Sequence, residues 1–434
     1  IIFIFMSITT FDDVNISNNI KKAVKDMGFE EPSAIQKITI PEALKGKDII
    51  GQAQTGTGKT VAFGIPLLQK IFIKDKSPQA IVICPTRELS IQVANEISKL
   101  GSNIKKLKVL PVYGGQPIGR QIRVLKKGVH IVIGTPGRIL DHIERGTLDL
   151  IGIETVVLDE ADEMLDMGFR EDIEKILRHT PKQRQTLLFS ATVPDEIKRI
   201  AKFYQRKPEF LKVSSKQMTV PEITEYYYNV GDRQKLDALC RLIDVYDVDL
   251  GLVFCNTKRR VDYVVRRLKS RGYSVEGIHG DIDQKNRDKV MNKFRRGDIE
   301  ILIATDVAAR GIDVPNVEIV FNYDLPQNPE YYVHRIGRTA RAGNIGYAFT
   351  FVEPKEHKLL NNIRKITKSK IKKQQIPDFN EMNNIKNKLI FNEIKNTIKK
   401  EDLKEYRRSI KDFTKKDFTT LEVAAALLKL VKEE

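Results

Sequence analysis

The sequence predicts an α/β protein with two tandem parallel-sheet domains followed by a helical C-terminal region. Three observations lead to this class. Short Val/Ile/Leu runs alternate with helical patterns through most of the chain, which is typical of a parallel sheet covered on both faces. Two pairs of similar segments recur at nearly one spacing, which indicates a duplicated domain. Beyond about Pro354 the strand signals end, and Lys, Asn, Ile and Glu follow at helical spacing.

The duplication rests on matching strand ends. "AIVICPTREL" (80–89) resembles "GLVFCNTKRR" (251–260), so Thr257 follows Thr86 at an offset of 171, and "HIVIGTPGR" (130–138) resembles "EILIATDVAAR" (300–310), so Thr305 follows Thr135 at an offset of 170. Further buried strands are expected at 48–50, 155–159 and 186–190. The segment near 207–221 has two prolines and little periodicity, which favours a linker there. The expected domains are residues 1–208 and 221–355, with a linker at 209–220 and a basic helical region at 356–434.

Composition narrows the class of protein. A net charge of +17 indicates a polyanionic partner, with solvated surface lysines as the alternative. From residue 355 onward, 21 Lys and Arg stand against 12 Asp and Glu, a net +9. Three cysteines without metal spacing favour a reducing cytoplasm. No apolar run reaches the ~20 residues that span a bilayer, and we expect Met6 to be the start rather than "IIFIFM" to be a signal peptide.

A glycine-rich stretch, "AQTGTGKT" (53–60), follows an expected strand and begins a helical pattern. Backbone N–H groups of such a loop surround phosphate oxygens, while Lys59 supplies charge and the Thr60 hydroxyl binds Mg²⁺. Ala53 occupies the position where the usual pattern has glycine. The alternative is a glycine turn without a ligand.

Two further patterns support phosphate chemistry. "VVLDEAD" ends an apolar strand in Asp159 and Glu160, which suit Mg²⁺ binding through water and activation of an attacking water; an acidic helix N-terminus is the alternative. "HRIGRTARAG" (334–343) places Arg335, Arg338 and Arg341 at three-residue intervals, as arginines that share a helical face and reach a γ-phosphate. A solvated basic helix is the alternative there.

The order of these motifs resembles the DEAD-box ATP-dependent RNA helicases over about residues 11 to 350. The resemblance is carried by "GFEEPSAIQ" (28–36), "AQTGTGKT", "PTREL" (85–89), "GG" (114–115), "TPGR" (135–138), "DEAD" (159–162), "SAT" (190–192), "VFCNT" (253–257), "ATDVAARGID" (304–313) and "HRIGRTARAG". The tail, in "EDLKEYRRSI" (401–410) and "VAAALLKL" (423–430), is similar to the dimerisation region of bacterial cold-shock members. The resemblance implies two RecA-like domains.

The resemblance also implies roles for individual residues. For ATP, Gln36 would read the adenine with Phe29 stacked on it and Phe11 behind; apolar burial is the alternative for both aromatic rings. The remaining implied ATP-binding residues are Thr55, Gly56, Thr57, Gly58, Lys59, Thr60, Gly311 and Asp313. Asp159 and Thr60 would hold Mg²⁺, Glu160 the lytic water, Arg338 and Arg341 the γ-phosphate, and His334 would link the domains. Ser190 and Thr192 would couple the nucleotide to RNA through hydroxyl bonds to the acidic pair.

RNA would lie across both domains through backbone contacts that do not read sequence. The implied contacts are Pro85, Thr86, Arg87, Gly115, Thr135, Arg138, Asn256, Thr257, Gly280, Arg287 and Thr305, with turns or helix caps as the alternative for each. Closure on ATP and RNA would bend one strand and locally unwind a short duplex, and hydrolysis would reopen the cleft. The alternative function is a nucleotide-gated RNA clamp with slow hydrolysis.

Two departures and the tail complete the expectations. Ala340 stands where the family has glycine between the arginines, and Asn344 where many members have a basic residue. The apolar helix after the capping-box pattern Thr419 to Glu422 either packs within its own domain or forms a dimer seam. We expect a cytoplasmic homodimer through residues 360–434, with ribosome-assembly or RNA-decay machinery as possible partners.

Overall fold

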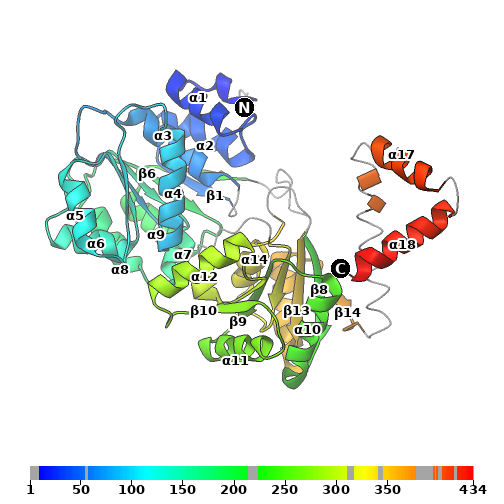
Figure 1. The fold of residues 1–434 in the computed structure, drawn as a ribbon. Coiled ribbons are helices and arrows are strands. Elements are labelled where there is room, and N and C mark those ends of the chain that lie inside the picture. The colour runs from blue at the N-terminus through cyan, green and yellow to red at the C-terminus, as the bar shows by residue number, and fades with distance from the viewer. Residues whose placement is uncertain are drawn as a thin grey trace, which may run out of the picture. The chain divides into compact units, whose positions relative to one another are not determined.

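The computed structural model describes residues 9–53, 57–213, 223–309, 317–340, 346–377, 394–395, 397–398, 403–414 and 418–433. Thr55, Gly56, Gly311, Asp313 and Arg341 therefore lie outside the described residues. The chain forms two compact units, residues 1–229 with 249–373, and residues 230–248 with 374–434. The first unit contains both β-sheets (Figure 1).

The first sheet has seven strands in the order β3-β4-β2-β5-β6-β1-β7, and neighbouring strands run parallel. Its strands are β1 (Ile49–Gln52), β2 (Ala80–Ile83), β3 (Val109–Val112), β4 (Ile131–Gly134), β5 (Thr155–Leu158), β6 (Gln185–Ser190) and β7 (Glu209–Lys212). Its helices are η1 (Phe11–Asp13), α1 (Asn18–Asp26), α2 (Ala34–Leu44), α3 (Lys59–Lys70), α4 (Arg87–Leu100), α5 (Ile118–Lys126), α6 (Pro136–Glu144), α7 (Ala161–Asp166), α8 (Arg170–Arg178) and α9 (Asp195–Tyr204).

Strand residues of the first sheet alternate between two hydrophobic cores. Ile81 and Ile83 face one core with residues of α6 to α9, whereas Val82 faces the other with residues of α2 to α4. Both faces are covered, so the strands read as continuous apolar runs rather than alternating ones. The expected strands near 48–50, 80–84, 155–159 and 186–190 are thus confirmed, with ends shifted by one or two residues.

The second sheet repeats the first. Its order is β10-β11-β9-β12-β13-β8-β14, so each strand has its counterpart seven strands earlier in the chain. Its strands are β8 (Ile223–Asn229), β9 (Gly251–Cys255), β10 (Val275–Ile278), β11 (Ile301–Thr305), β12 (Ile319–Asn322), β13 (Gly346–Val352) and β14 (Lys372–Gln374). The helices that accompany this sheet are α11 (Lys258–Lys269), α12 (Gln284–Arg296), α13 (Asp306–Ala309), α14 (Pro329–Ile336), η4 (Pro354–Glu356) and α15 (His357–Thr367). The duplication is confirmed.

Matching residues of the duplication have matching local structure. The Thr86 hydroxyl accepts the Leu89 N–H at the start of α4, and the Thr257 hydroxyl accepts the Arg260 N–H at the start of α11. Both hydroxyls lie 3.2 Å from the nitrogen they cap. A threonine N-cap after a buried strand satisfies a helix N–H that otherwise has no partner.

The sheets extend further than the expected boundaries. Strand β7 pairs with β1, so the first sheet continues to Lys212, four residues past Pro208 and into the expected linker. After the second sheet, Leu360, Ile363 and Ile371 are buried in its core, and β14 forms its edge. Residues 360–374 are therefore part of the second sheet's fold rather than of a separate tail, because their apolar side chains complete its core.

The second unit contains only helices among its described residues. These are η2 (Asp232–Gln234), α10 (Lys235–Tyr246), α17 (Lys404–Phe413) and α18 (Thr420–Glu433). The expected capping box begins α18, since the Glu422 N–H donates to the Thr419 hydroxyl and the Thr419 N–H donates to the Glu422 carboxylate. Phe413 and Phe418 stack between α17 and α18 with ring centroids 5.8 Å apart. In the part of the chain described, no helix is long and apolar enough to cross a membrane.

Candidate nucleotide and RNA sites

The candidate residues divide along the edge of each sheet. In the first sheet, the nucleotide candidates follow β1, β5 and β6, which are neighbours, whereas the RNA candidates follow β2, β3 and β4, which form the other half. The second sheet repeats this division, with RNA candidates after β9, β10 and β11. Because parallel strands end at one edge, sequence-distant residues meet there. The sheet order alone thus separates two sites on one edge.

The phosphate loop is held to the start of α2. The Gln36 amide donates to the Gly58 carbonyl at 3.0 Å and accepts the Ser33 N–H at 2.8 Å, while the Ser33 hydroxyl donates to the Thr57 carbonyl. Gly58 has φ +84°, and a Cβ there would lie 2.4 Å from Gln36 Nε2, so only glycine fits. The Gln36 side chain keeps a second N–H and a second lone pair, which is one donor and one acceptor for a base edge.

Lys59 is the first residue of α3 and is buried, with a side chain 7% exposed in spite of its charge. Its Nζ has no hydrogen-bond partner among the described residues. A buried ammonium without a partner is costly, so the position suits an anionic ligand.

Asp159 follows β5 and is almost completely buried. Burial raises its pKa to about 7; the positive charge of Lys59 lowers the pKa and the neighbouring Glu160 raises it. A carboxylate in this environment is stabilised in its charged form by an added cation. Together with the half-buried Thr60 hydroxyl, this oxygen donor set fits Mg²⁺, which prefers carboxylate, hydroxyl and water ligands.

Glu160 has an unusual backbone. Its φ of +50° and ψ of +53° lie in the left-handed region, immediately before α7. Its N–H donates to the Asp159 carboxylate at 3.0 Å, which closes a tight turn between strand and helix. A non-glycine residue in this region costs about 1–3 kcal/mol and is concentrated at functional sites. The turn aims the Glu160 side chain independently of α7.

The coupling hydroxyls bond to a different residue from the expected pair, namely Asp162. The Thr192 N–H and hydroxyl donate to Asp162 Oδ2 at 2.8 and 3.1 Å, and the Asp162 N–H donates to the Ser190 hydroxyl at 3.2 Å. The expected bonds to Asp159 and Glu160 are therefore wrong. Asp162 is the second residue of α7, which packs against β6. The last residue of the "DEAD" motif itself was the signal that sequence reasoning passed over.

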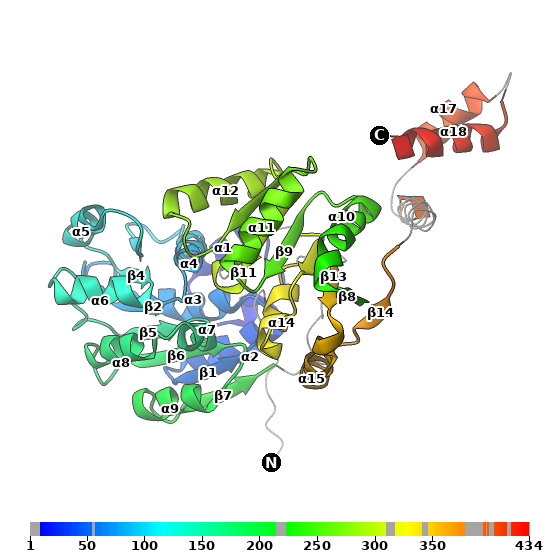
Figure 2. The same cartoon turned by 90° about the horizontal axis from the view of Figure 1, so that it is seen from below.

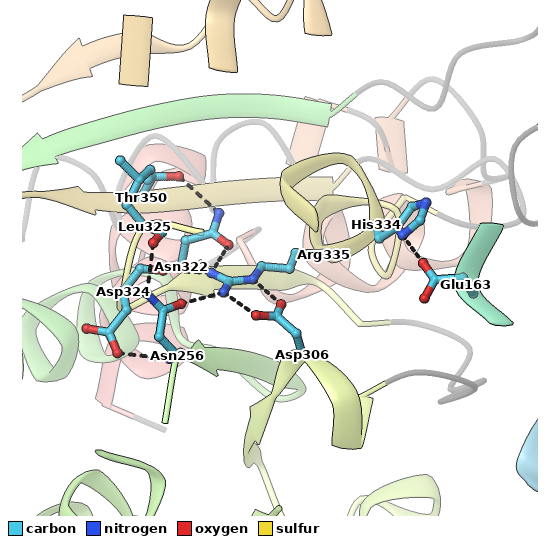
Figure 3. Close-up of polar contacts among 9 residues, drawn as sticks. All are labelled: Glu163, Asn256, Asp306, Asn322, Asp324, Leu325, His334, Arg335 and Thr350. Atoms are coloured by element: carbon cyan, nitrogen blue, oxygen red, sulfur yellow. Dashed lines mark hydrogen bonds and ion pairs between the residues drawn. The ribbon is translucent and has the colours of Figure 1, made fainter. Parts of the chain in front are cut away.

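Arg335 is the centre of a buried polar network rather than a surface arginine (Figure 3). Only 1% of it is exposed, and it makes five hydrogen bonds. Its acceptors are Asp306 Oδ1 at 2.5 Å, Asp306 Oδ2 at 2.7 Å, the Asp324 carbonyl at 2.6 Å, Asn256 Oδ1 at 2.8 Å and Asn322 Oδ1 at 3.3 Å. The expectation that it shares a helical face with Arg338 is wrong, because α14 ends at Ile336 and Arg338 lies in the following turn. The alternative of a solvated basic helix is wrong for Arg335 as well, since this side chain is buried.

His334, on a helix of the second sheet, contacts a helix of the first sheet. Its Nδ1 is ion-paired with the Glu163 carboxylate on α7 (Figure 3). Burial lowers the pKa of His334, but the Glu163 hydrogen bond and the charges of Glu163 and Asp162 outweigh burial and the opposing Arg338, so the pKa is raised. The link between the two sheets that was implied for His334 is present as this contact. Glu163 was not among the expected residues.

The His334–Glu163 pair predicts a pH dependence. Since the folded-state pKa of His334 lies above its usual 6.5, the pair contributes fully below about pH 6.5 and is lost as the pH rises through the raised value. We expect the thermal-unfolding midpoints of the wild type and His334→Gln to differ most near pH 6 and to converge by pH 9. Replacing the exposed His179 with Gln is the control, and the difference between its midpoint and that of the wild type should not change with pH. A difference that is constant with pH would contradict the assignment.

Several RNA candidates of the first sheet also have structural roles. Pro85 and Thr86 are buried, and Thr86 caps α4, so the capping alternative applies to its side chain. Arg138 donates to the Gln116 carbonyl and to Gln121 Oε1. Thr135 is the N-cap residue of α6 without a side-chain cap bond, which leaves its hydroxyl for another partner. Gly115 is exposed with φ +81°.

The candidate arginines Arg87 and Arg287 take part in a reciprocal pair of ion pairs. Arg87 contacts Asp288 at 2.7 Å, and Arg287 contacts the residue next to Arg87, Glu88, at 3.1 Å. Arg87 also lies over the Tyr113 ring at 4.7 Å. Each guanidinium meets a carboxylate from the other sheet's helices, α4 or α12. Both arginines thus already hold anionic oxygen atoms.

The other RNA candidates of the second sheet lie at its carboxyl edge. Thr257 and Gly280 are exposed, and Thr305 ends β11. Asn256 is exposed as a residue, but its Oδ1 accepts from Arg335 and its Nδ2 donates to the Leu325 carbonyl at 3.0 Å. One N–H of the Asn256 amide remains for a ligand.

The two aromatic candidates differ in environment. Phe11 is buried in the first sheet's core, as the apolar alternative predicts, whereas Phe29 is 39% exposed and available for stacking. Ala340 has φ +56°, which explains why glycine is common at its position. A Cβ at Gly346 would meet the Ala340 backbone nitrogen at 2.7 Å, so the neighbouring chain confines this turn.

Two parallel sheets that repeat the same strand order in tandem define the class of tandem RecA-like proteins. Family models match in sequence order: the DEAD/DEAH box helicase at residues 33–200, the helicase conserved C-terminal domain at 234–343, and the RNA helicase DeaD dimerization domain at 377–434. The DEAD-box ATP-dependent RNA helicase CshA of Geobacillus kaustophilus is 52% identical over 98% of this chain and 91% of its own length. The CshA of Bacillus subtilis is 51% identical over 98% of this chain and 86% of its own length.

A solved structure agrees with these relatives. S. cerevisiae Dbp5 bound to RNA and ADP BeF3 is 32% identical and covers 88% of this chain and 99% of its own, with a TM-score of 0.78. The chain belongs to the DEAD-box ATP-dependent RNA helicases.

Proposed function

We propose that this protein is an ATP-dependent RNA helicase that binds RNA backbone across both sheets, locally unwinds short duplexes and hydrolyses ATP to recycle. The observation that carries the proposal is the buried Lys59 ammonium, which lacks a hydrogen-bond partner among the described residues and follows the loop held by Gln36. Lys59 binds the β- and γ-phosphates of ATP, Gln36 and Phe29 bind the adenine, and Arg338 approaches the γ-phosphate. Family membership supports these roles.

Mg²⁺ would be held by Asp159, partly through water, and by the Thr60 hydroxyl. When bound, it supplies charge neutralisation at the phosphate oxygens. Glu160 orients and deprotonates the attacking water, and its left-handed turn holds it apart from α7. Asp162 connects this site to Ser190 and Thr192, so a shift of the β6 end on RNA binding reaches the acidic turn through three hydrogen bonds.

The alternative function, a nucleotide-gated RNA clamp with slow hydrolysis, is not favoured. Its hallmark would be an incomplete hydrolytic set, and Lys59, Asp159, Glu160 and Arg338 are all in place. We expect ATP hydrolysis to be stimulated strongly by single-stranded RNA and little by DNA of the same sequence, at several salt concentrations. ATP-dependent RNA retention with negligible turnover would instead establish the clamp.

The reciprocal ion pairs predict that Asp288 competes with RNA for Arg87. In Asp288→Asn the guanidinium loses its carboxylate at 2.7 Å and is released for phosphate. Because half-exposed ion pairs contribute about 0.2–1 kcal/mol, we expect RNA to bind roughly two- to fivefold tighter. Asp298→Asn, also exposed on the second sheet's side, serves as the charge-matched control in a fluorescence-anisotropy titration. Unchanged or weaker binding in Asp288→Asn alone would contradict competition.

We also propose that the protein is a homodimer, formed through residues after 377 rather than from 360. The dimerization-domain match at 377–434 supports this, as do the exposed apolar residues of α18, with Leu421 79%, Leu427 48% and Leu430 61% exposed. An apolar helix left exposed in this way favours burial against a second copy.

The dimer proposal predicts that Leu427→Asp with Leu430→Asp yields a monomer by light scattering, because two charges enter an apolar seam. Lys429→Asp lies on the polar side of α18, with Glu422 and Glu433, and should leave the mass unchanged. Truncation should begin after Pro377, since Leu360, Ile363 and Ile371 belong to the second sheet's core. A monomeric wild type would remove the proposal.

We also propose a cytoplasmic location for the protein. The three cysteines are free and buried, which supports a reducing, cytoplasmic location. Ribosome-assembly or RNA-decay machinery remains a proposal for its partners, because RNA backbone contacts alone select no particular RNA.

A further inference from the structure

Helix α11 presents a basic and aromatic face to solvent. Arg259, Tyr263, Arg266 and Arg267 are exposed. Tyr263 lies four residues after Arg259, and Arg266 and Arg267 lie three and four residues after Tyr263, so all four lie along one side of the helix. The opposite side is buried through Val261, Val264 and Leu268. The Tyr263 side chain is 38% exposed although the ring is large and apolar. This group of four is called the α11 face below.

The positive charge of the α11 face is not neutralised by its neighbours. Lys258 pairs with Asp281 at 2.5 Å, and Lys269 pairs with Glu276 at 2.8 Å, at the two ends of the helix. Asp262, the acidic residue within α11, is paired with His279 at 3.0 Å. The three arginines between them have no carboxylate within ion-pairing distance in the described part of the chain. Nearby carboxylates thus have other partners.

The α11 face continues from the candidate RNA site. Thr257, an RNA candidate, is the N-cap residue of α11. Helix α11 packs on β10, which ends at Ile278 two residues before Gly280, and on β11, which ends at Thr305 (Figure 2). With a rise of 1.5 Å per residue, Arg267 lies about 15 Å along the helix from Thr257. A strand that leaves the carboxyl edge of the second sheet beside Thr257 therefore meets the α11 face next.

We propose that the α11 face is an auxiliary binding site for single-stranded RNA that extends from the main site. The three arginines bind phosphates and Tyr263 stacks on a base, a combination that is tolerant of sequence. The proposal rests on the helicase function proposed above. Helix α11 would then anchor the part of an RNA strand that extends beyond the main site.

The test compares RNA strands of about 8 and about 20 nucleotides, since one binding fold covers roughly 4–16 nucleotides. In the wild type the longer strand binds tighter. In Arg259→Ser/Arg266→Ser/Arg267→Ser we expect the ratio of the two affinities, longer strand over shorter, to fall by about tenfold or more at low salt. The slope of log affinity against log salt concentration for the longer strand should become shallower by about 2, since each lost phosphate contact removes about 0.7. Binding of the short strand and its stimulation of ATP hydrolysis should be unchanged.

Tyr263→Ser and Tyr263→Phe separate stacking from charge. We expect Tyr263→Ser to lower the affinity for the longer strand by about tenfold. Tyr263→Phe should retain this affinity, because phenylalanine keeps the aromatic ring. Helix α9 offers a matched control, since Arg199, Lys202 and the exposed Phe203 have similar spacing but no RNA candidate at the helix start. Substituting these three with serine should leave both strands unaffected.

The outcomes are distinct. If the triple-serine variant loses equal affinity for both strands, the α11 site is overturned. If it loses no affinity for the longer strand, the site is also overturned, and an acidic protein becomes the expected ligand of the α11 face. Absence of RNA-stimulated hydrolysis by the wild type on the short strand would instead overturn the proposed function.

Discussion

Replacing Glu160 with Gln is expected to lower the RNA-stimulated rate of ATP hydrolysis by about 10²–10⁴-fold, the usual contribution of a positioned general base. The amide orients water but accepts no proton. Binding should persist, since Lys59, Asp159 and the Asp162 hydrogen bonds are unaltered. The variant should therefore accumulate as a complex with ATP and RNA, measurable as slowed release of labelled RNA in single-turnover conditions.

The geometry around Glu160 allows this substitution without a change in the local structure. Gln has the same size, and the backbone bond from the residue 160 N–H to the Asp159 carboxylate keeps the left-handed turn. Glu171→Gln, an exposed carboxylate in the first turn of α8, is the matched control and should turn over normally. Normal turnover in Glu160→Gln would remove the assigned role, whereas loss of ATP binding would show that the turn itself had been disturbed.

Replacing Arg335 with Met is expected to destabilise the second sheet's fold by about 3–5 kcal/mol, the cost of breaking a buried ion pair by removing one partner. Five hydrogen bonds end on this guanidinium, and Asp306 is left without its cation. The calorimetric midpoint of the corresponding transition should fall by on the order of 10 °C. The midpoint of the first sheet's transition should move much less.

Two further variants test whether the network or the charge is responsible. Arg335→Lys keeps the charge but lacks the planar fork that reaches Asp306, Asn256 and the Asp324 carbonyl together, so it should recover less than half of the loss. Arg335→Met with Asp306→Leu removes both charges and should be more stable than Arg335→Met alone. Equal stability of Arg335→Lys and the wild type would show that geometry contributes nothing.

The positions of the nucleotide-binding motifs and the duplication of the sheet could be predicted from the local sequence. Buried parallel strands read as apolar runs, and a ligand-binding loop must follow a strand, so "AQTGTGKT" and "VVLDEAD" indicate their own positions. The threonines at equal offsets, Thr86 and Thr257, have the same capping role because each begins a helix after a matching strand. Period and residue type carry this information without any long-range contact.

Only the tertiary structure decided which polar side chains meet. Arg335 and Arg338, two of the equally spaced arginines in "HRIGRTARAG", have different surroundings. Arg335 is buried because the ends of β9, β11 and β12 converge on it, while Arg338 lies beyond the helix end. Likewise Asp162, rather than Asp159, receives the Thr192 bond, and Asp288 reaches Arg87 from 201 residues away. Side-chain pairing depends on distances across strand ends and between sheets, and those distances are set by packing that no local pattern encodes.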